Sequence, residues 1–194
     1  NFAAALADLS ERTGPDDTLL IFFSGHGEKV ENMSTERDGS AETIELFDAP
    51  LHDYELAGMM QSVTARTLLV IDACFAGGVD QGIFSSDADT LSLVAQGDKS
   101  GGYISHLFRR ALEGEADMNG DGAMEAGELS EYMRREFYRA VLAEPLGTDA
   151  EDFRDHQVPG FQHIIVDRGG DGMPFQQVLL DFDSVSTPTL ARRD

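Results

Sequence analysis

Residues 18–27 read TLLIFFSGHG, and residues 67–78 read TLLVIDACFAGG. Each segment begins with an unbroken apolar run, which is typical of strands buried on both faces of a parallel sheet. Each run then leads into a short glycine-containing turn that carries one reactive side chain, His26 in the first and Cys74 in the second. Ligands of open α/β sheets bind at the carboxyl ends of the strands. If the two strands are parallel neighbours, His26 and Cys74 meet at that edge.

The rest of the chain alternates between helical and extended patterns. Helical periodicity predicts helices at residues 2–12, 53–63, 103–115 and 126–143. Further strands are predicted at residues 90–95, 163–167 and 177–182, and a short one at 43–47 within a polar, loop-like stretch at 28–50. Residues 75–89 and 144–160 are loop-like as well. This order predicts an α/β sandwich with a mainly parallel central sheet and helices on both faces. We expect one domain over residues 1–184 and a frayed tail at residues 185–194.

Composition and charge argue against several classes of function and location. The net charge of −22 argues against a nucleic-acid partner, because such proteins need basic patches to displace counterions. No apolar run reaches the roughly 20 residues of a membrane span. The single cysteine excludes an internal disulfide, which favours a reducing, cytoplasmic location. The chain begins at Asn1 inside a predicted helix, so we expect it to be a trimmed or processed piece.

Cys74 and His26 are residue types that can act together as a nucleophile and its base. A thiol with a pKa of about 8.5 is only slightly ionised at neutral pH, and a neighbouring imidazole can take its proton. The backbone N–H groups of Gly27 and Cys74 could then face a developing oxyanion. Taken singly, a cysteine at a strand end is more often a small buried apolar residue. The pair, each at the end of an apolar strand, favours nucleophilic chemistry.

The segments FFSGHG (22–27) and VIDACFAGG (70–78) resemble the paired signature of the caspase and metacaspase superfamily. The resemblance, closest to prokaryotic metacaspase-like proteins, extends over roughly residues 2–182. It implies a caspase-like cysteine endopeptidase with His26 and Cys74 as the catalytic dyad. It also implies an oxyanion hole formed by Gly27 and Cys74, a large-subunit-like part at 1–89 and a small-subunit-like part at 90–184. Family members carry a strand and a helix ahead of residues 2–12, so we expect a missing N-terminal fragment as a partner and an exposed sheet edge at the 18–23 strand.

The same resemblance bears on the substrate. Metacaspases hold Arg or Lys side chains with acidic residues, and Ser24 and Asp72 match positions near that pocket. Asp98 is a second acidic candidate, although a solvated loop acid is its more common role. Residues 75–92 contain neither Lys nor Arg, so an enzyme specific for basic residues would not cut itself there. We expect a protein or peptide substrate with a basic cleavage residue, and Lys29 and Arg37 as sites of self-cleavage.

Residues 117–128 read DMNGDGAMEAGE and match the twelve-residue EF-hand calcium pattern. The pattern assigns oxygen ligands to Asp117, Asn119, Asp121, Ala123, Glu125 and Glu128. Gly122 would allow the sharp turn that the loop needs. An acidic turn that caps the following helix is the alternative, and the chain contains no second copy to pair with the loop. Asp38 and Glu42 are weaker candidates for a separate acidic calcium site.

Two other functions remain open at this stage. The chain could be an inactive caspase-like module that binds calcium or a partner protein. It could also be an unrelated flavodoxin-like domain, although that leaves the Gly25-His26-Gly27 turn unexplained. The intact pair of His26 and Cys74 favours the peptidase. A part in bacterial stress, cell-death or antiviral signalling is suggested by the resemblance alone.

Overall fold

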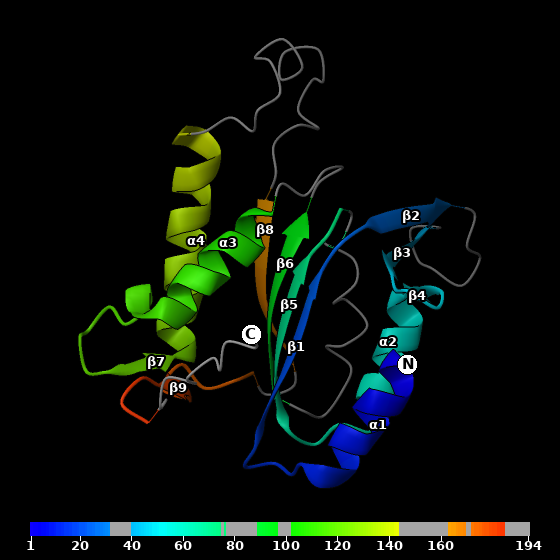
Figure 1. Ribbon diagram of the computed structural model, residues 1–194, viewed down its shortest axis with the longest axis horizontal. Coiled ribbons are helices and arrows are strands. Elements are labelled where there is room, and N and C mark those ends of the chain that lie inside the picture. Colours follow the sequence, from blue (N-terminus) through cyan, green and yellow to red (C-terminus); the bar gives the residue numbers. More distant parts are fainter. Residues whose placement is uncertain are drawn as a thin grey trace, which may run out of the picture.

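The computed structural model describes residues 1–31, 40–74, 76, 89–96, 102–143, 163–169 and 172–184. At its centre lies a four-stranded sheet with the order β1-β5-β6-β8 (Figure 1). Its strands are β1 (Thr18–Ser24), β5 (Arg66–Asp72), β6 (Thr90–Gln96) and β8 (His163–Gly169). Strands β1, β5 and β6 are parallel, and β8 is antiparallel to β6. The two apolar runs that end in His26 and Cys74 are therefore parallel neighbours, as predicted.

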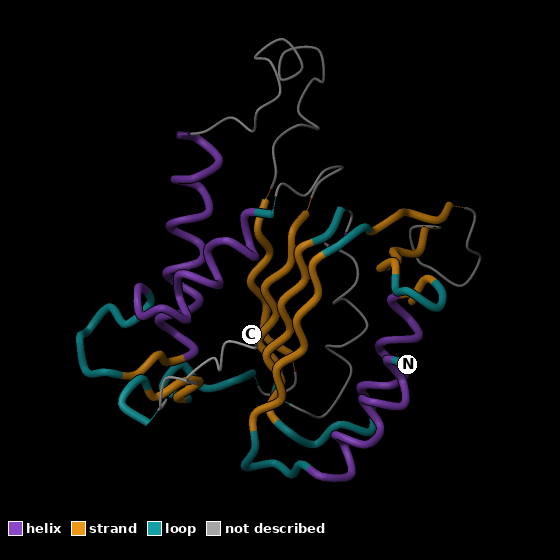
Figure 2. The backbone as a smooth tube through the Cα atoms, in the orientation of Figure 1, coloured by secondary structure: helices purple, strands orange, loops and turns teal. Residues whose placement is uncertain are grey.

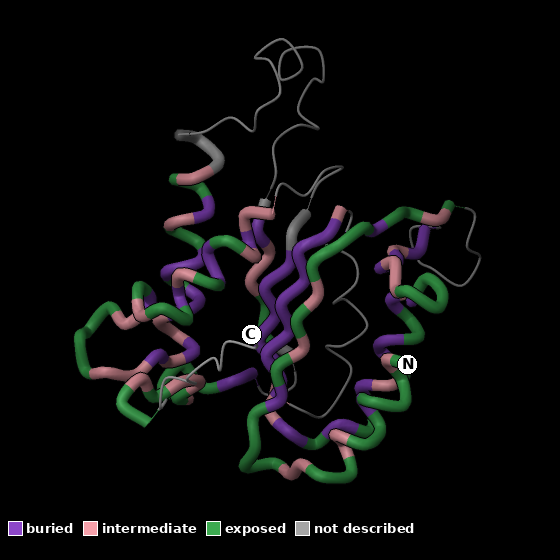
Figure 3. The backbone as a smooth tube through the Cα atoms, in the orientation of Figure 1, coloured by how far each residue is buried: buried purple, intermediate pink, exposed green. Residues whose placement is uncertain are grey.

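Helices cover both faces of this sheet. Helices α1 (Phe2–Arg12) and α2 (Asp53–Met60) lie on one side, and α3 (Tyr103–Arg110) and α4 (Ala126–Ala143) lie on the other (Figure 2). Side chains of β5 alternate between two apolar cores, with Leu68 and Val70 on the α3–α4 side and Leu69 and Ile71 on the α1–α2 side. Figure 3 shows β5 and β6 as the most buried strands. The structure thus confirms the predicted fold class. None of the described helices is both long and apolar enough to cross a membrane.

Strand β1 meets the expectation of an exposed sheet edge but not the expectation of burial on both faces. It is the edge strand of the described sheet, and Leu20 and Phe22 on its α3 side are 47% and 48% exposed. Leu19 on the opposite side is buried. The α3 side of β1 is covered only in part, where Phe22 stacks on Phe108 of α3 with ring centroids 6.0 Å apart. An apolar run alone could not distinguish a central strand from this half-covered edge strand.

A small three-stranded sheet follows β1. It contains β2 (Gly27–Glu31), β3 (Ser40–Glu45) and β4 (Pro50–His52), in that order. Only a strand at 43–47 was predicted here, so β2 and β4 were missed and β3 was placed too late. The reason is composition, because β2 reads GEKVE and lacks the apolar pattern of a strand. Strands β2 and β4 are formed by antiparallel pairing with β3 and carry no apolar pattern that would predict them.

A second small sheet joins the predicted calcium loop to the last described segment. Strand β7 (Ala123–Glu125) pairs antiparallel with β9 (Val178–Asp181). A strand over residues 177–182 was predicted, but it lies apart from the central sheet. Strand β7 was not predicted, because three residues inside an acidic loop carry no periodic signal.

Helix α3 is shorter than the predicted 103–115. It continues as a π-helical turn, η3 (Ala111–Glu115), in which Gly114 adopts φ of 105°. A wide turn of this kind is an irregularity that periodicity does not reveal. It brings Glu115 to two partners, the Arg110 guanidinium (2.8 Å) and the Tyr132 hydroxyl of α4 (3.0 Å).

The Tyr132 hydroxyl gives this junction a pH dependence. Burial, together with the hydroxyl's bond to Glu115, raises the pKa of Tyr132 to about 12. The neutral phenol is favoured in the folded state, so its stabilisation is present below the unfolded pKa of about 10 and is lost as pH rises towards 12. We expect Tyr132→Phe to lower the free energy of unfolding by about 1 kcal/mol at neutral pH. Denaturant unfolding at several pH values checks this: the difference from the wild type should shrink between pH 10 and 12, and a constant difference would contradict it.

Candidate active site

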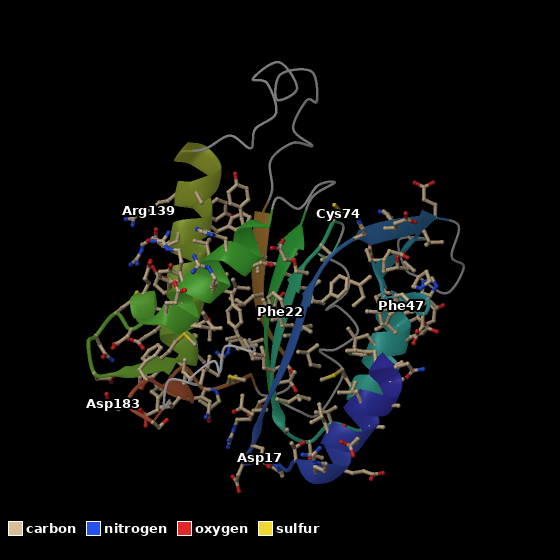
Figure 4. All side chains as sticks on the ribbon, viewed as in Figure 1. Asp17, Phe22, Phe47, Cys74, Arg139 and Asp183 are labelled. Carbon is tan, nitrogen blue, oxygen red and sulfur yellow. The ribbon has the colours of Figure 1, made fainter. Side chains whose placement is uncertain are left out.

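The ends of β1 and β5 are aligned at the carboxyl edge of the sheet. Ser24 and Asp72 face each other in the parallel register, and the pairing continues for one further hydrogen bond, from the Gly25 N–H to the Asp72 carbonyl (3.2 Å). His26 and Cys74 each follow two residues after the Ser24–Asp72 pair. Figure 4 shows Cys74 at this edge. The topology therefore brings the segments of the predicted dyad together.

The His26 segment is held by the small sheet. The Glu45 N–H donates a 2.9 Å hydrogen bond to the His26 carbonyl, and Gly27 is paired with Ile44. The His26 side chain is exposed and Cys74 is half-buried. Both residues therefore reach the surface at this edge.

Gly27 is in direct contact with the Cys74 backbone. A Cβ atom at Gly27 would lie 2.2 Å from the Cys74 carbonyl oxygen and 3.0 Å from the Thr43 carbonyl oxygen. Only glycine fits such an approach without displacing the backbone. The missing side chain of Gly27 therefore leaves room for the Cys74 segment itself.

The register also orients the Gly27 amide. Residues of an antiparallel pair alternate between those that bond to the partner strand and those that point away from it. His26 bonds to Glu45, so the Gly27 N–H at the next position is directed away from β3. This direction is compatible with the predicted oxyanion role, which stays a prediction.

Asp72 lies beneath the edge and is only 2% exposed. Its Oδ2 atom accepts a 2.8 Å hydrogen bond from the Ser105 N–H in the first turn of α3. No sequence pattern identified Ser105 as a neighbour of the site. Asp98, the other predicted pocket acid, lies outside the described residues, as do Asp38 and Arg37.

The predicted calcium loop lies far from this edge, beyond the other end of α3 (Figure 1). Its side-chain oxygens accept hydrogen bonds from the loop's own amides. Asp117 accepts from the amides of Gly120 and Gly122, and Glu128 accepts from those of Met118 and Asn119. Within the described part of the chain, no three His, Cys, Asp or Glu side chains are grouped so as to hold a metal ion. The donors are all hard oxygens, which fits calcium, but binding would have to replace these amide partners.

The sheet order, the helices on both faces and the paired strand ends define a caspase-like α/β protein. The chain belongs to the caspase domain family, whose model matches residues 1–164. This family typically consists of cysteine peptidases. The fold is also similar to the crystal structure of protein GSU0716 from Geobacter sulfurreducens, with 19% identity and a TM-score of 0.54, over 91% of this chain and 75% of that one. Among curated proteins, none matches this chain.

Proposed function

We propose that this protein is a cysteine endopeptidase with Cys74 as the nucleophile and His26 as the general base. The observation that carries the proposal is the parallel register of β1 and β5, which ends in the His26 and Cys74 segments with Gly27 against the Cys74 carbonyl. Membership of the caspase domain family supports it. The alternative is an inactive caspase-like module, in which the Cys74 thiol would react no faster than an ordinary thiol.

The proposed reaction follows from the two side chains. His26 takes the thiol proton, and the Cys74 sulfur attacks the scissile carbonyl carbon. The N–H groups of Gly27 and Cys74 stabilise the oxyanion of the tetrahedral intermediate. Collapse of this intermediate breaks the C–N bond, and His26 returns the proton to the departing amine. Water then hydrolyses the thioester and regenerates the thiol.

We further propose that cleavage follows Arg or Lys. Asp72 is the acidic side chain closest in sequence to Cys74, and it shares the carboxyl edge with Ser24. A carboxylate pairs with a guanidinium through two parallel hydrogen bonds, so it can select a basic side chain. The net charge of −22 also attracts basic peptides. Asp98 remains a candidate second acid.

Fluorogenic peptides that end in Arg, Lys or Asp but are otherwise identical test this specificity. We expect kcat/KM for the Arg and Lys peptides to exceed that for the Asp peptide by at least about 100-fold. The buried Asp72 carboxylate would repel the negatively charged side chain of a substrate Asp. The catalytic variant Cys74→Ala is the matched control for contaminating peptidases. Preferential cleavage after Asp would contradict basic specificity and leave the peptidase proposal intact.

Calcium binding by residues 117–128 is a separate proposal, supported by the pattern and by the oxygen-only donor set. A cation that binds only the folded state raises stability by RT ln(1 + [Ca²⁺]/Kd), about 2.7 kcal/mol at 100 times Kd. We therefore expect a higher Tm in calcium than in EDTA, and no such difference in Glu128→Gln. Glu131→Gln, in the same helix but outside the loop pattern, is the control. Equal melting curves of the wild type in the two buffers would show that the loop is a passive cap.

A further inference from the structure

Helix α3 contacts the candidate specificity residue directly. Its hydrogen-bonding pattern begins with the His106 N–H donating to the Gly102 carbonyl (3.0 Å), so the preceding amides have no partner within the helix. One of these, the Ser105 N–H, donates to Asp72. Asp72 thus caps the helix from a neighbouring strand, although it is 33 residues away in the sequence.

The burial of Asp72 makes this bond important. A carboxylate that is only 2% exposed is costly unless it is hydrogen-bonded. The positive end of a helix stabilises an anion, and the Ser105 amide is a fixed donor because the helix holds it. With Oδ2 tied to this amide at 2.8 Å, the carboxylate has a defined orientation at the end of β5.

Helix α3 is itself anchored to the strands of the site. Phe108, one turn after Ser105, is buried and stacks on Phe22 of β1, two residues before Ser24. Ile104 and Leu107 are buried in the core beside Leu68 and Val70 of β5. The helix is therefore a rigid support that contacts both catalytic strands.

We propose that the Ser105 amide of α3 is a positioning group for the specificity pocket, holding the Asp72 carboxylate ready for an arginine side chain of the substrate. This inference rests on the proposed function. It extends the pocket to a backbone donor in a helix that no sequence pattern assigned to it. A preorganised carboxylate discriminates charge better than a mobile one, because its orientation is fixed before substrate binds.

The test compares two substrates that differ only in charge, a peptide ending in arginine and the same peptide ending in citrulline. Ser105→Pro removes the donor N–H within the first helical turn, where proline is best tolerated. Ser105→Ala retains the N–H and is the matched control. The Ser105 hydroxyl is buried without a partner among the described residues, so its removal costs no hydrogen bond. A second variant replaces the amide of Ser105→Ala by an ester, through lactic acid at position 105, in case Ser105→Pro does not fold.

We expect the arginine-to-citrulline ratio of kcat/KM to fall roughly tenfold in Ser105→Pro and in the ester variant, and to stay unchanged in Ser105→Ala. Asp72→Asn should lower the ratio at least as far. Iodoacetamide does not use the specificity pocket. In all of these variants the rate at which it alkylates Cys74 should therefore stay within about twofold of the wild-type rate. An unchanged ratio, even with lower rates for both peptides, would overturn the inference and leave Ser105 as a structural cap. Failure of the proposed function is distinguishable, because the wild type would then cleave neither peptide.

Discussion

Replacing Cys74 by alanine is expected to abolish peptide hydrolysis, with a loss of roughly 10⁴-fold or more in kcat. In the proposed mechanism the thiol supplies the electron pair that forms the bond to the scissile carbonyl carbon, and alanine has no such group. Cys74 is the only cysteine, so labelling by iodoacetamide should also disappear completely. Peptide turnover and the mass of the labelled protein measure the two effects. Residual hydrolysis at the wild-type rate would mean that another group carries the reaction.

His26→Ala separates an activated thiol from an ordinary one. If His26 draws the proton from Cys74, its removal should slow alkylation at neutral pH, because less thiolate is present. His106→Ala on the exposed surface of α3 is the control and should label at the wild-type rate. Equal labelling of His26→Ala and wild type would favour the inactive caspase-like module.

The elements predicted correctly are those with a strong and sustained pattern. Helix α4 has the predicted bounds of 126–143, β5 extends the predicted run at 67–71 by one residue at each end, and β6 extends the predicted 90–95 by one residue. A long amphipathic period or a continuous apolar run predicts the type and place of an element, although it does not distinguish a central strand from an edge strand such as β1. Strands β2 and β4 were missed because their stability comes from pairing within the small sheet, and pairing leaves no mark on a polar sequence.

In the candidate site, too, some features could be predicted from the sequence and others could not. The meeting of the His26 and Cys74 segments could be predicted, because parallel strands end at one edge. The close approach of Gly27 to Cys74 and the bond from the Ser105 amide to Asp72 could not, since each depends on backbone atoms that residues of other types also carry. The sequence shows a glycine beside His26, but not that a carbonyl oxygen lies where its Cβ would be. It shows an Asp before Cys74, but not that a helix amide already binds it.

Gly27→Ala should consequently damage the site without changing any reactive side chain. The added Cβ would lie 2.2 Å from the Cys74 carbonyl oxygen, and the flanking contact at 3.0 Å is also a backbone oxygen, that of Thr43. No flexible side chain can give way, so the Cys74 turn or the start of β2 must move. Overpacking of this kind costs about 1–3 kcal/mol, and a shift of about 1 Å in a reacting group costs roughly 100-fold in rate.

Gly58→Ala is the control for Gly27→Ala, because Gly58 lies within α2 and a Cβ there would meet nothing within 4 Å. It should gain about 0.5–1 kcal/mol from the better helix propensity of alanine and keep full activity. We expect Gly27→Ala to lower Tm, slow the alkylation of Cys74 and reduce kcat/KM for arginyl peptides, whereas Gly58→Ala does none of these. A folded Gly27→Ala variant with wild-type kcat would mean that the Gly27–Cys74 contact does not position the nucleophile. A parallel loss of kcat and alkylation rate would instead tie the chemistry to this close approach of two backbone segments.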